Sequence, residues 1–210
     1  MLAVLTHPVY ARLFSAQVIA LIGTGLMTVA LGLLAYDLAG EAAGAVLGTA
    51  LTIKMVAYVG LSPIAAALAE RMPRKAVLVA ADLVRAAVAL ALPFIDAVWQ
   101  VYVLIFVLQA ASAGFTPAFQ AVIPDVLPEE GDYTRALSLS RLAYDLESLL
   151  SPALAGLLLL VMSYHGLFVG TVVGFLGSAL LVLGTTLPPR TETQGQRPFS
   201  ERLTRGARIY

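Results

Sequence analysis

The chain has 210 residues, of which 60% are hydrophobic and only 12% are Asp, Glu, Lys or Arg. Soluble domains carry roughly 25% charged residues, so this chain has too few to cover a soluble surface. Its thirteen basic residues balance its thirteen acidic ones, and no bulk field favours nucleic acid as a partner. It has no cysteine, which excludes disulfides and thiolate metal sites. The composition indicates an integral membrane protein in a lipid bilayer.

Six apolar segments are long enough to cross a bilayer as helices. A crossing needs about 20 mostly apolar residues, and backbone groups in lipid must be hydrogen-bonded within the segment. The short alternating strands of a membrane β-barrel are absent from the sequence. The first segment lacks the cleavage features of a signal peptide, so we expect it to be retained. We predict an all-α bundle over residues 1–187, then a cytoplasmic linker over 188–210, with crossings at 13–36, 45–69, 76–95, 101–123, 136–160 and 167–187.

The distribution of Lys and Arg predicts the orientation in the membrane. Outside the six segments, basic residues precede the first or follow the second, fourth and sixth, and none follows the first, third or fifth. Basic connections stay on the cytoplasmic side, so both termini are expected in the cytoplasm, in a cell (inner) membrane. The outer connections are a few residues long, which leaves no room for an extracellular domain. The basic residues concerned are Arg12, Arg71, Arg74, Lys75, Arg135, Arg190, Arg197, Arg202, Arg205 and Arg208.

The connection between the second and third segments reads AALAERMPRK. It could serve only to fix the topology, as a basic hairpin does in many membrane proteins. Its charges also suit a gate, because a carboxylate such as Glu70 can face the positive N-terminus of an opposing helix. Arg71, Arg74 and Lys75 can pair with acids on neighbouring helix ends, and Asp125 at the end of the fourth segment is the candidate partner for an arginine.

This connection resembles the signature of the major facilitator superfamily, Gly-x-x-x-Asp-Arg-x-Gly-Arg-[Arg/Lys]. Arg71, Arg74 and Lys75 match its basic positions, Glu70 stands where Asp is usual, and alanine and proline replace the two glycines. The resemblance implies a secondary-active transporter with two six-helix halves and a solute between them. This chain would then supply the N-terminal half, built from two inverted triplets of helices, of a twelve-helix protein.

The fifth segment contains the sequence SPALAG, with proline at position 152. A proline inside a helix removes a hydrogen bond and kinks it, which could be ordinary packing. The stretch also resembles the superfamily's antiporter signature, Gly-Pro-x-x-Gly-Gly, which Pro152 and Gly156 match. That likeness implies efflux. Segments 23–26, 53–58 and 141–147 look most like the nickel-resistance exporters, whereas the fourth-helix arginine of proton antiporters is absent.

Five ionisable residues within the predicted crossings are candidates for a functional role. Such residues are costly in lipid and usually have a function or a partner. Asp82 and Arg85 are three apart on one helix face and are expected to form a structural ion pair. Asp145 and Glu147 are the candidates for a proton or cation site, and Lys54 could neutralise one of them. No imidazole cluster accompanies them, so we predict no fixed metal site and no cofactor.

The leading hypothesis is half of an exporter, proton-coupled by antiport, for a metal cation or a small drug-like solute. Its partner would be a missing C-terminal six-helix half or a second copy of the chain, and a truncated chain is the favoured explanation over a split or dimeric protein. The alternative is a membrane scaffold or assembly partner that transports nothing. The sequence has no His-Glu-x-x-His, no Gly-x-Ser-x-Gly and no phosphate-binding glycine loop, so we do not expect an enzyme.

Overall fold

The computed structural model describes residues 2–188. For residue 2 and residues 66–71 it describes the backbone alone. This part of the chain folds into six α-helices with three short 3-10 helices and no β-strand. The predicted linker therefore lies, apart from Pro188, outside the described residues. The all-α architecture is confirmed over the described part, with helices α1 (Pro8–Ala39), α2 (Ala43–Arg71), α3 (Arg74–Ala91), α4 (Val98–Val126), α5 (Glu130–Leu159) and α6 (Tyr164–Leu183).

Five helical stretches among the described residues are long and apolar enough to cross a membrane. The first, Pro8–Ala65, is 58 residues long and contains α1 and most of α2, joined by the 3-10 turn η2 (Gly40–Ala42). A single crossing needs only about 20 residues, and the turn divides this stretch into two helices. The other four stretches correspond to α3 to α6.

Local sequence explains where the helices stop. α1 ends at Gly40, which has a positive φ of 52° and donates its backbone N–H to the Tyr36 carbonyl; glycine adopts such a backbone without steric cost. α2 ends because Met72 precedes Pro73 and is extended, with ψ 154°, as residues before proline are. Gln100 caps the start of α4 by accepting the N–H groups of residues 96 and 97. The connections are short, so consecutive helices run antiparallel.

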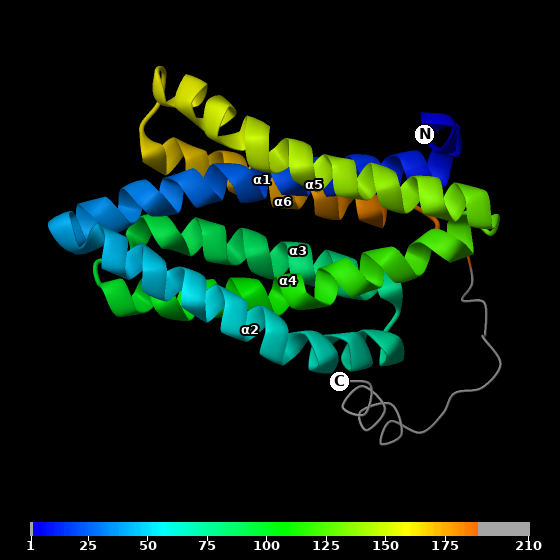
Figure 1. Ribbon diagram of the computed structural model, residues 1–210, viewed down its shortest axis with the longest axis horizontal. Helices are drawn as coiled ribbons and strands as arrows, with labels where there is room; N and C mark the ends of the chain where they lie inside the picture. The colour runs from blue at the N-terminus through cyan, green and yellow to red at the C-terminus, as the bar shows by residue number, and fades with distance from the viewer. Residues whose placement is uncertain (1, 189–210) are drawn as a thin grey trace.

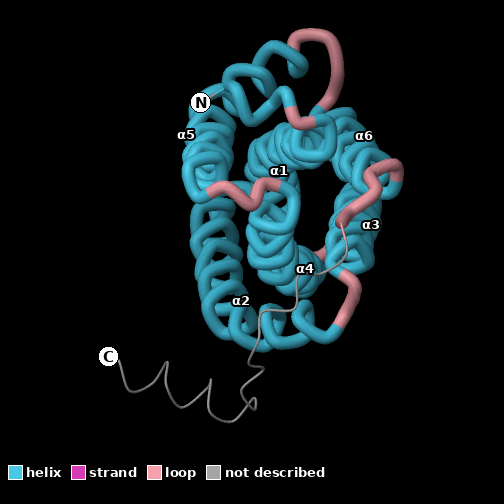
Figure 2. Tube along the Cα trace, turned by 90° about the vertical axis from the view of Figure 1, so that its right-hand side faces the viewer, coloured by secondary structure: helices cyan, strands magenta, loops and turns pink. Residues whose placement is uncertain are grey.

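Figure 1 shows the six helices side by side along the long axis. The α2–α3 and α4–α5 connections and the N-terminus lie at one end, which we call the basic end because Arg12, Arg74, Lys75 and Arg135 lie there. The three other connections lie at the opposite end. Viewed end-on, α1 and α4 stand between two pairs, α3 with α6 on one side and α2 with α5 on the other (Figure 2).

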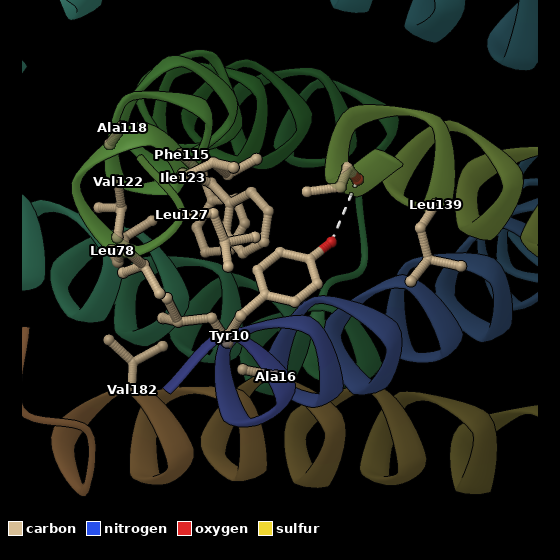
Figure 3. Packing of buried hydrophobic residues seen from close by; sticks show 14 of the residues in the cluster. Tyr10, Ala16, Leu78, Phe115, Ala118, Val122, Ile123, Leu127, Leu139 and Val182 are labelled. Carbon is tan, nitrogen blue, oxygen red and sulfur yellow. Dashed lines mark hydrogen bonds between the residues drawn. The ribbon is translucent and has the colours of Figure 1, made fainter. Parts of the chain in front are cut away.

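A buried cluster joins the helices near the basic end (Figure 3). Tyr10 of α1 is fully buried within it and donates its hydroxyl to the Ala136 carbonyl of α5, at 3.1 Å. Phe115 and Ile123 of α4 and Val182 of α6 are also buried in this cluster. Residues of α3 belong to the same cluster, so apolar contacts hold five helices together here, and the buried phenol finds the hydrogen-bond acceptor that it needs.

The contact between α1 and α6 depends on small residues. Thr171 donates its hydroxyl to the Gly23 carbonyl, at 2.9 Å. A Cβ added at Gly23 would lie 3.1 Å from the Thr171 carbonyl oxygen, and one at Gly174 would lie 3.1 Å from that of Ile19. The two backbones therefore approach each other more closely than larger side chains would permit, as in other membrane helix pairs.

Candidate functional site

A cavity of about 750 Å³ lies between α1, α2, α4 and α5. α3 and α6 reach it with one residue each, Arg85 and Phe175. Most of the lining is apolar, and Leu21, Met27 and Ile105 are among its side chains. Cavities of roughly 300–1,000 Å³ with a mainly apolar lining and a few polar groups are typical of small-molecule sites. This cavity is the candidate functional site.

Uncharged polar side chains are spread through the apolar lining. Gln17 on α1 and Gln109 and Gln120 on α4 all line the cavity. Gln17 accepts a hydrogen bond from Ser140 of α5, at 3.0 Å, and both side chains are buried. This bond joins α1 to α5 beside the cavity. The sequence interpretation missed these glutamines, although a glutamine within an otherwise apolar crossing is the signal that could have found them.

Three cationic side chains line the cavity, each from a different helix: Lys54 of α2, Arg85 of α3 and Arg141 of α5. Among the described residues, no aspartate or glutamate belongs to the lining. Lys54 is half-buried near the middle of α2. Of the five predicted ionisable candidates, the structure therefore places only Lys54 and Arg85 at the cavity.

Arg85 is held in place from three directions. It forms an ion pair within α3 with Asp82, which is fully buried. Ser178 of α6 donates to the other carboxylate oxygen of Asp82, at 2.7 Å. The guanidinium carbon lies 4.3 Å from the ring centre of Phe115 and 4.7 Å from that of Phe175, within the range of cation–π attraction. In the described part of the chain, Arg85 Nε has no hydrogen-bond partner.

Asp145 and Glu147 of α5 lie outside the cavity lining, in two different surroundings. Asp145 is exposed and forms an ion pair with Arg141, whose Nε lies 3.4 Å from Oδ1. Glu147 lies where α5 meets α1, with Oε1 2.8 Å from the position of a Cβ added at Gly25. It accepts a weak hydrogen bond from Ser151, at 3.4 Å, and is close enough to Lys54 to interact electrostatically. A proton or cation role for either carboxylate stays a prediction.

At the basic end, the first residues of α3 tie two other helices together. Arg74 forms an ion pair with Asp125 and donates to the Ala121 carbonyl, both on α4. Lys75 donates to the carbonyls of Leu183 and Thr185 at the end of α6, at 2.6 and 2.9 Å. The last carbonyls of a helix lack partners and carry partial negative charge, so these cations suit them. The side chains of the predicted gate residues Glu70 and Arg71 lie outside the described residues.

The antiporter-like stretch of α5 places its residues on two faces. Ser151 and Ala155, which stand where the signature has glycine, are buried. A Cβ added at Gly25 of α1 would clash with the side chain of Ser151, so this position makes the close contact with α1. Pro152 and Gly156 face away, and nothing lies within 4 Å of a Cβ added at Gly156.

Comparisons with known proteins agree with this architecture. The sequence profile of the Major Facilitator Superfamily matches residues 13–208. The chain belongs to the major facilitator superfamily. It is therefore a multi-pass membrane protein, and its membership favours a transporter over an enzyme. No solved structure matches the chain with significance.

Three relatives of this superfamily member are distant in sequence. The chain is 26% identical to macrolide efflux protein A of Streptococcus pyogenes over 184 residues, covering 85% of this chain and 45% of that protein. It is 28% identical to macrolide efflux protein A of Enterococcus faecalis over 152 residues, covering 68% and 47%. It is 29% identical to the uncharacterized MFS-type transporter YfiS of Bacillus subtilis over 122 residues, covering 58% and 29%. The chain spans less than half the length of these relatives.

Proposed function

We propose that this chain is one half of a secondary-active exporter that moves a small drug-like solute through the cavity between α1, α2, α4 and α5. The observation that carries the proposal is the cavity itself, because it combines the size of a drug-binding site with apolar walls and scattered polar groups. The macrolide efflux relatives support an organic solute over the nickel ion that short segments of the sequence suggested.

Within this half, we propose six crossings arranged as two inverted triplets. The helix pairs that contact each other at more than one or two points are α1 with α2, α4, α5 and α6; α2 with α3 and α4; α3 with α4 and α6; and α5 with α4 and α6. If α1 is exchanged with α4, α2 with α5 and α3 with α6, the same set of contacting pairs results. A structural repeat of three helices predicts such a relation, and the end-on arrangement in Figure 2 supports it.

The exposed ion pair of α5 supports a second half, whether a C-terminal segment or another copy. Arg141 and Asp145 lie near the middle of α5, with 80% and 58% of their side chains exposed. A charged residue facing lipid at that depth would cost about 2.5–3.5 kcal/mol. A face that meets water in a central cavity, or a second bundle, avoids this cost.

The basic end would face the cytoplasm, because basic residues favour that side, and would contain the gate. Arg74 and Lys75 fix the end of α3 to those of α4 and α6, which makes these three ends one unit able to rock against the second half. Coupling to a proton gradient would then use Asp145 or Glu147. Both the cytoplasmic gate and the proton coupling are part of the proposal.

A matched pair of substitutions tests whether the cavity is the transport route. Thr28 of α1 lines the cavity, whereas Thr49 of α2 is exposed and does not, and each hydroxyl donates to a carbonyl of its own helix. In cells that lack their own exporters and express the complete protein, Thr28→Trp should cut efflux of radiolabelled chloramphenicol, an uncharged drug, at least tenfold. Thr49→Trp should leave it unchanged. Equal efflux by both variants would reject the cavity route and favour a scaffold.

A further inference from the structure

The charges around the cavity are sorted by sign. Three cations line the cavity, whereas the nearest described carboxylates do not belong to the lining. Asp82 is buried within α3, Asp145 lies on the exposed face of α5, and Glu147 lies in the contact between α5 and α1. A solute in the cavity would therefore meet the ammonium and guanidinium groups first, whereas the carboxylates of Asp82 and Asp145 are already paired with arginines.

Arg85 has the features of a fixed anchoring group. Its residue is only 6% exposed, and Asp82 and the rings of Phe115 and Phe175 fix the guanidinium before any solute arrives. The guanidinium has five N–H donors in a rigid plane that suits oxyanions. The Nε donor has no hydrogen-bond partner within the described part of the chain, but it is itself buried, so a solute would have to approach the terminal nitrogens. Tyr144 also lines the cavity.

Lys54 supplies a second, less restrained cation. It is half-buried in the lining near the middle of α2, and no salt bridge to it is found among the described residues. An ammonium at this depth needs a counter-charge, because unpaired charges within a membrane protein are costly. Glu147 contributes at a distance, but it does not enter the cavity lining.

We propose that the cavity binds an amphipathic organic anion, with its carboxylate or other oxyanion at Lys54 and Arg85 and its apolar part against α1 and α4. Oxyanions form their strongest hydrogen bonds with such charged donors, and Met27 and Ile105 belong to the apolar walls on those helices. The same cations would repel a metal ion or an organic cation. This inference rests on the proposed function, because it names the class of solute for the same cavity.

Binding of a matched pair of probes tests the inference. The complete protein in lipid nanodiscs would be titrated with dansyl-phenylalanine, which is an anion, and with its neutral amide, using dansyl fluorescence and empty nanodiscs as the blank. The anion should bind at least tenfold more tightly than the amide. Lys54→Gln should remove most of that preference, and Lys54→Arg should retain it. Arg135→Gln is the control, because Arg135 pairs with Asp132 at the basic end, away from the lining.

Arg85 requires a double variant, because removing it alone leaves Asp82 charged and buried. Asp82→Asn combined with Arg85→Gln removes both charges together and should also weaken binding of the anion at least tenfold. Wild-type affinity for the anion in both Lys54→Gln and the double variant would overturn the inference. Tighter binding of ethidium, an organic cation, than of dansyl-phenylalanine would overturn it too. Chloramphenicol efflux that is sensitive to Thr28→Trp would still support the proposed function in that case, whereas insensitivity would reject that function.

Discussion

Two intrahelical ion pairs lie in opposite surroundings. Asp82 and Arg85 of α3 have side chains 0% and 8% exposed, and α4 and α6 surround them. Arg141 and Asp145 of α5 are 80% and 58% exposed, and their separation is 3.4 Å. The guanidinium of the first pair contacts a carboxylate and two aromatic rings, and its carboxylate accepts a hydrogen bond from a hydroxyl, whereas the second pair has no further side-chain partner among the described residues.

This contrast separates a packed side of the bundle from an open one. On the packed side, α3 and α6 contact each other and the central helices α1 and α4. On the open side, α2 and α5 border the cavity and carry many of the exposed apolar residues, such as Val59 and Leu149. We infer that the buried pair on the packed side stabilises the fold and holds Arg85 at the edge of the cavity, and that charges on the open side serve the solute or a second half.

The largest expected effect is on the buried pair. Asp82→Asn would leave Arg85 charged, buried and without its counter-ion, and breaking a buried pair in this way costs about 3–5 kcal/mol. The free energy of unfolding in detergent micelles, measured by denaturant titration, should fall by that amount. The double variant with Arg85→Gln removes both charges and should recover more than half of the loss. A loss below about 1 kcal/mol for the single variant would contradict the contrast between the two sides.

A smaller effect is expected from the contact between α1 and α6. Gly174→Leu would place a side chain against the backbone of α1, since even a Cβ lies 3.1 Å from the Ile19 carbonyl oxygen and 3.2 Å from Gly23 Cα. Overpacking of this kind costs about 1–3 kcal/mol. The control is Gly32→Leu in α1, where nothing lies within 4 Å of an added Cβ. The same titration should show a lower free energy of unfolding for Gly174→Leu and an unchanged one for Gly32→Leu. Equal losses in the two variants would mean that the contact between α1 and α6 tolerates a larger separation.

The sequence predicted the helices better than the faces they present. Hydropathy locates each apolar segment, and Pro73 and Gly40 explain two of the ends, because these are local properties. Which side of a helix meets the cavity depends on how that helix rotates against its neighbours, which is a tertiary property. The two-residue spacing of Asp145 and Glu147 predicts different faces of one helix, but only the tertiary structure shows that the first is exposed and the second lies against α1.

The cavity glutamines are a second feature that the sequence alone did not reveal. Gln17 and Gln109 stand in mainly apolar segments, with no motif to distinguish them. Their meaning comes from residues far away in sequence, since Gln17 bonds Ser140 of α5 across the bundle. The expected Asp82–Arg85 pair, in contrast, needs only the three-residue spacing of one helix, and the structure contains that ion pair.

The smallest expected effect on stability is at the exposed pair. Asp145→Asn should change the free energy of unfolding of this bundle by less than about 0.5 kcal/mol, because exposed pairs contribute little. If the open side contacts a second six-helix unit, the variant leaves Arg141 unpaired at that contact, and recovery of the two units together by affinity purification should fall. Arg141→Gln combined with Asp145→Asn would then restore recovery, since neither charge remains to be buried.

If the pair instead faces water in the central cavity, neither variant should alter recovery, and Asp145→Asn should change only transport. A fall in unfolding free energy comparable to that of Asp82→Asn would remove the distinction between the two sides of the bundle.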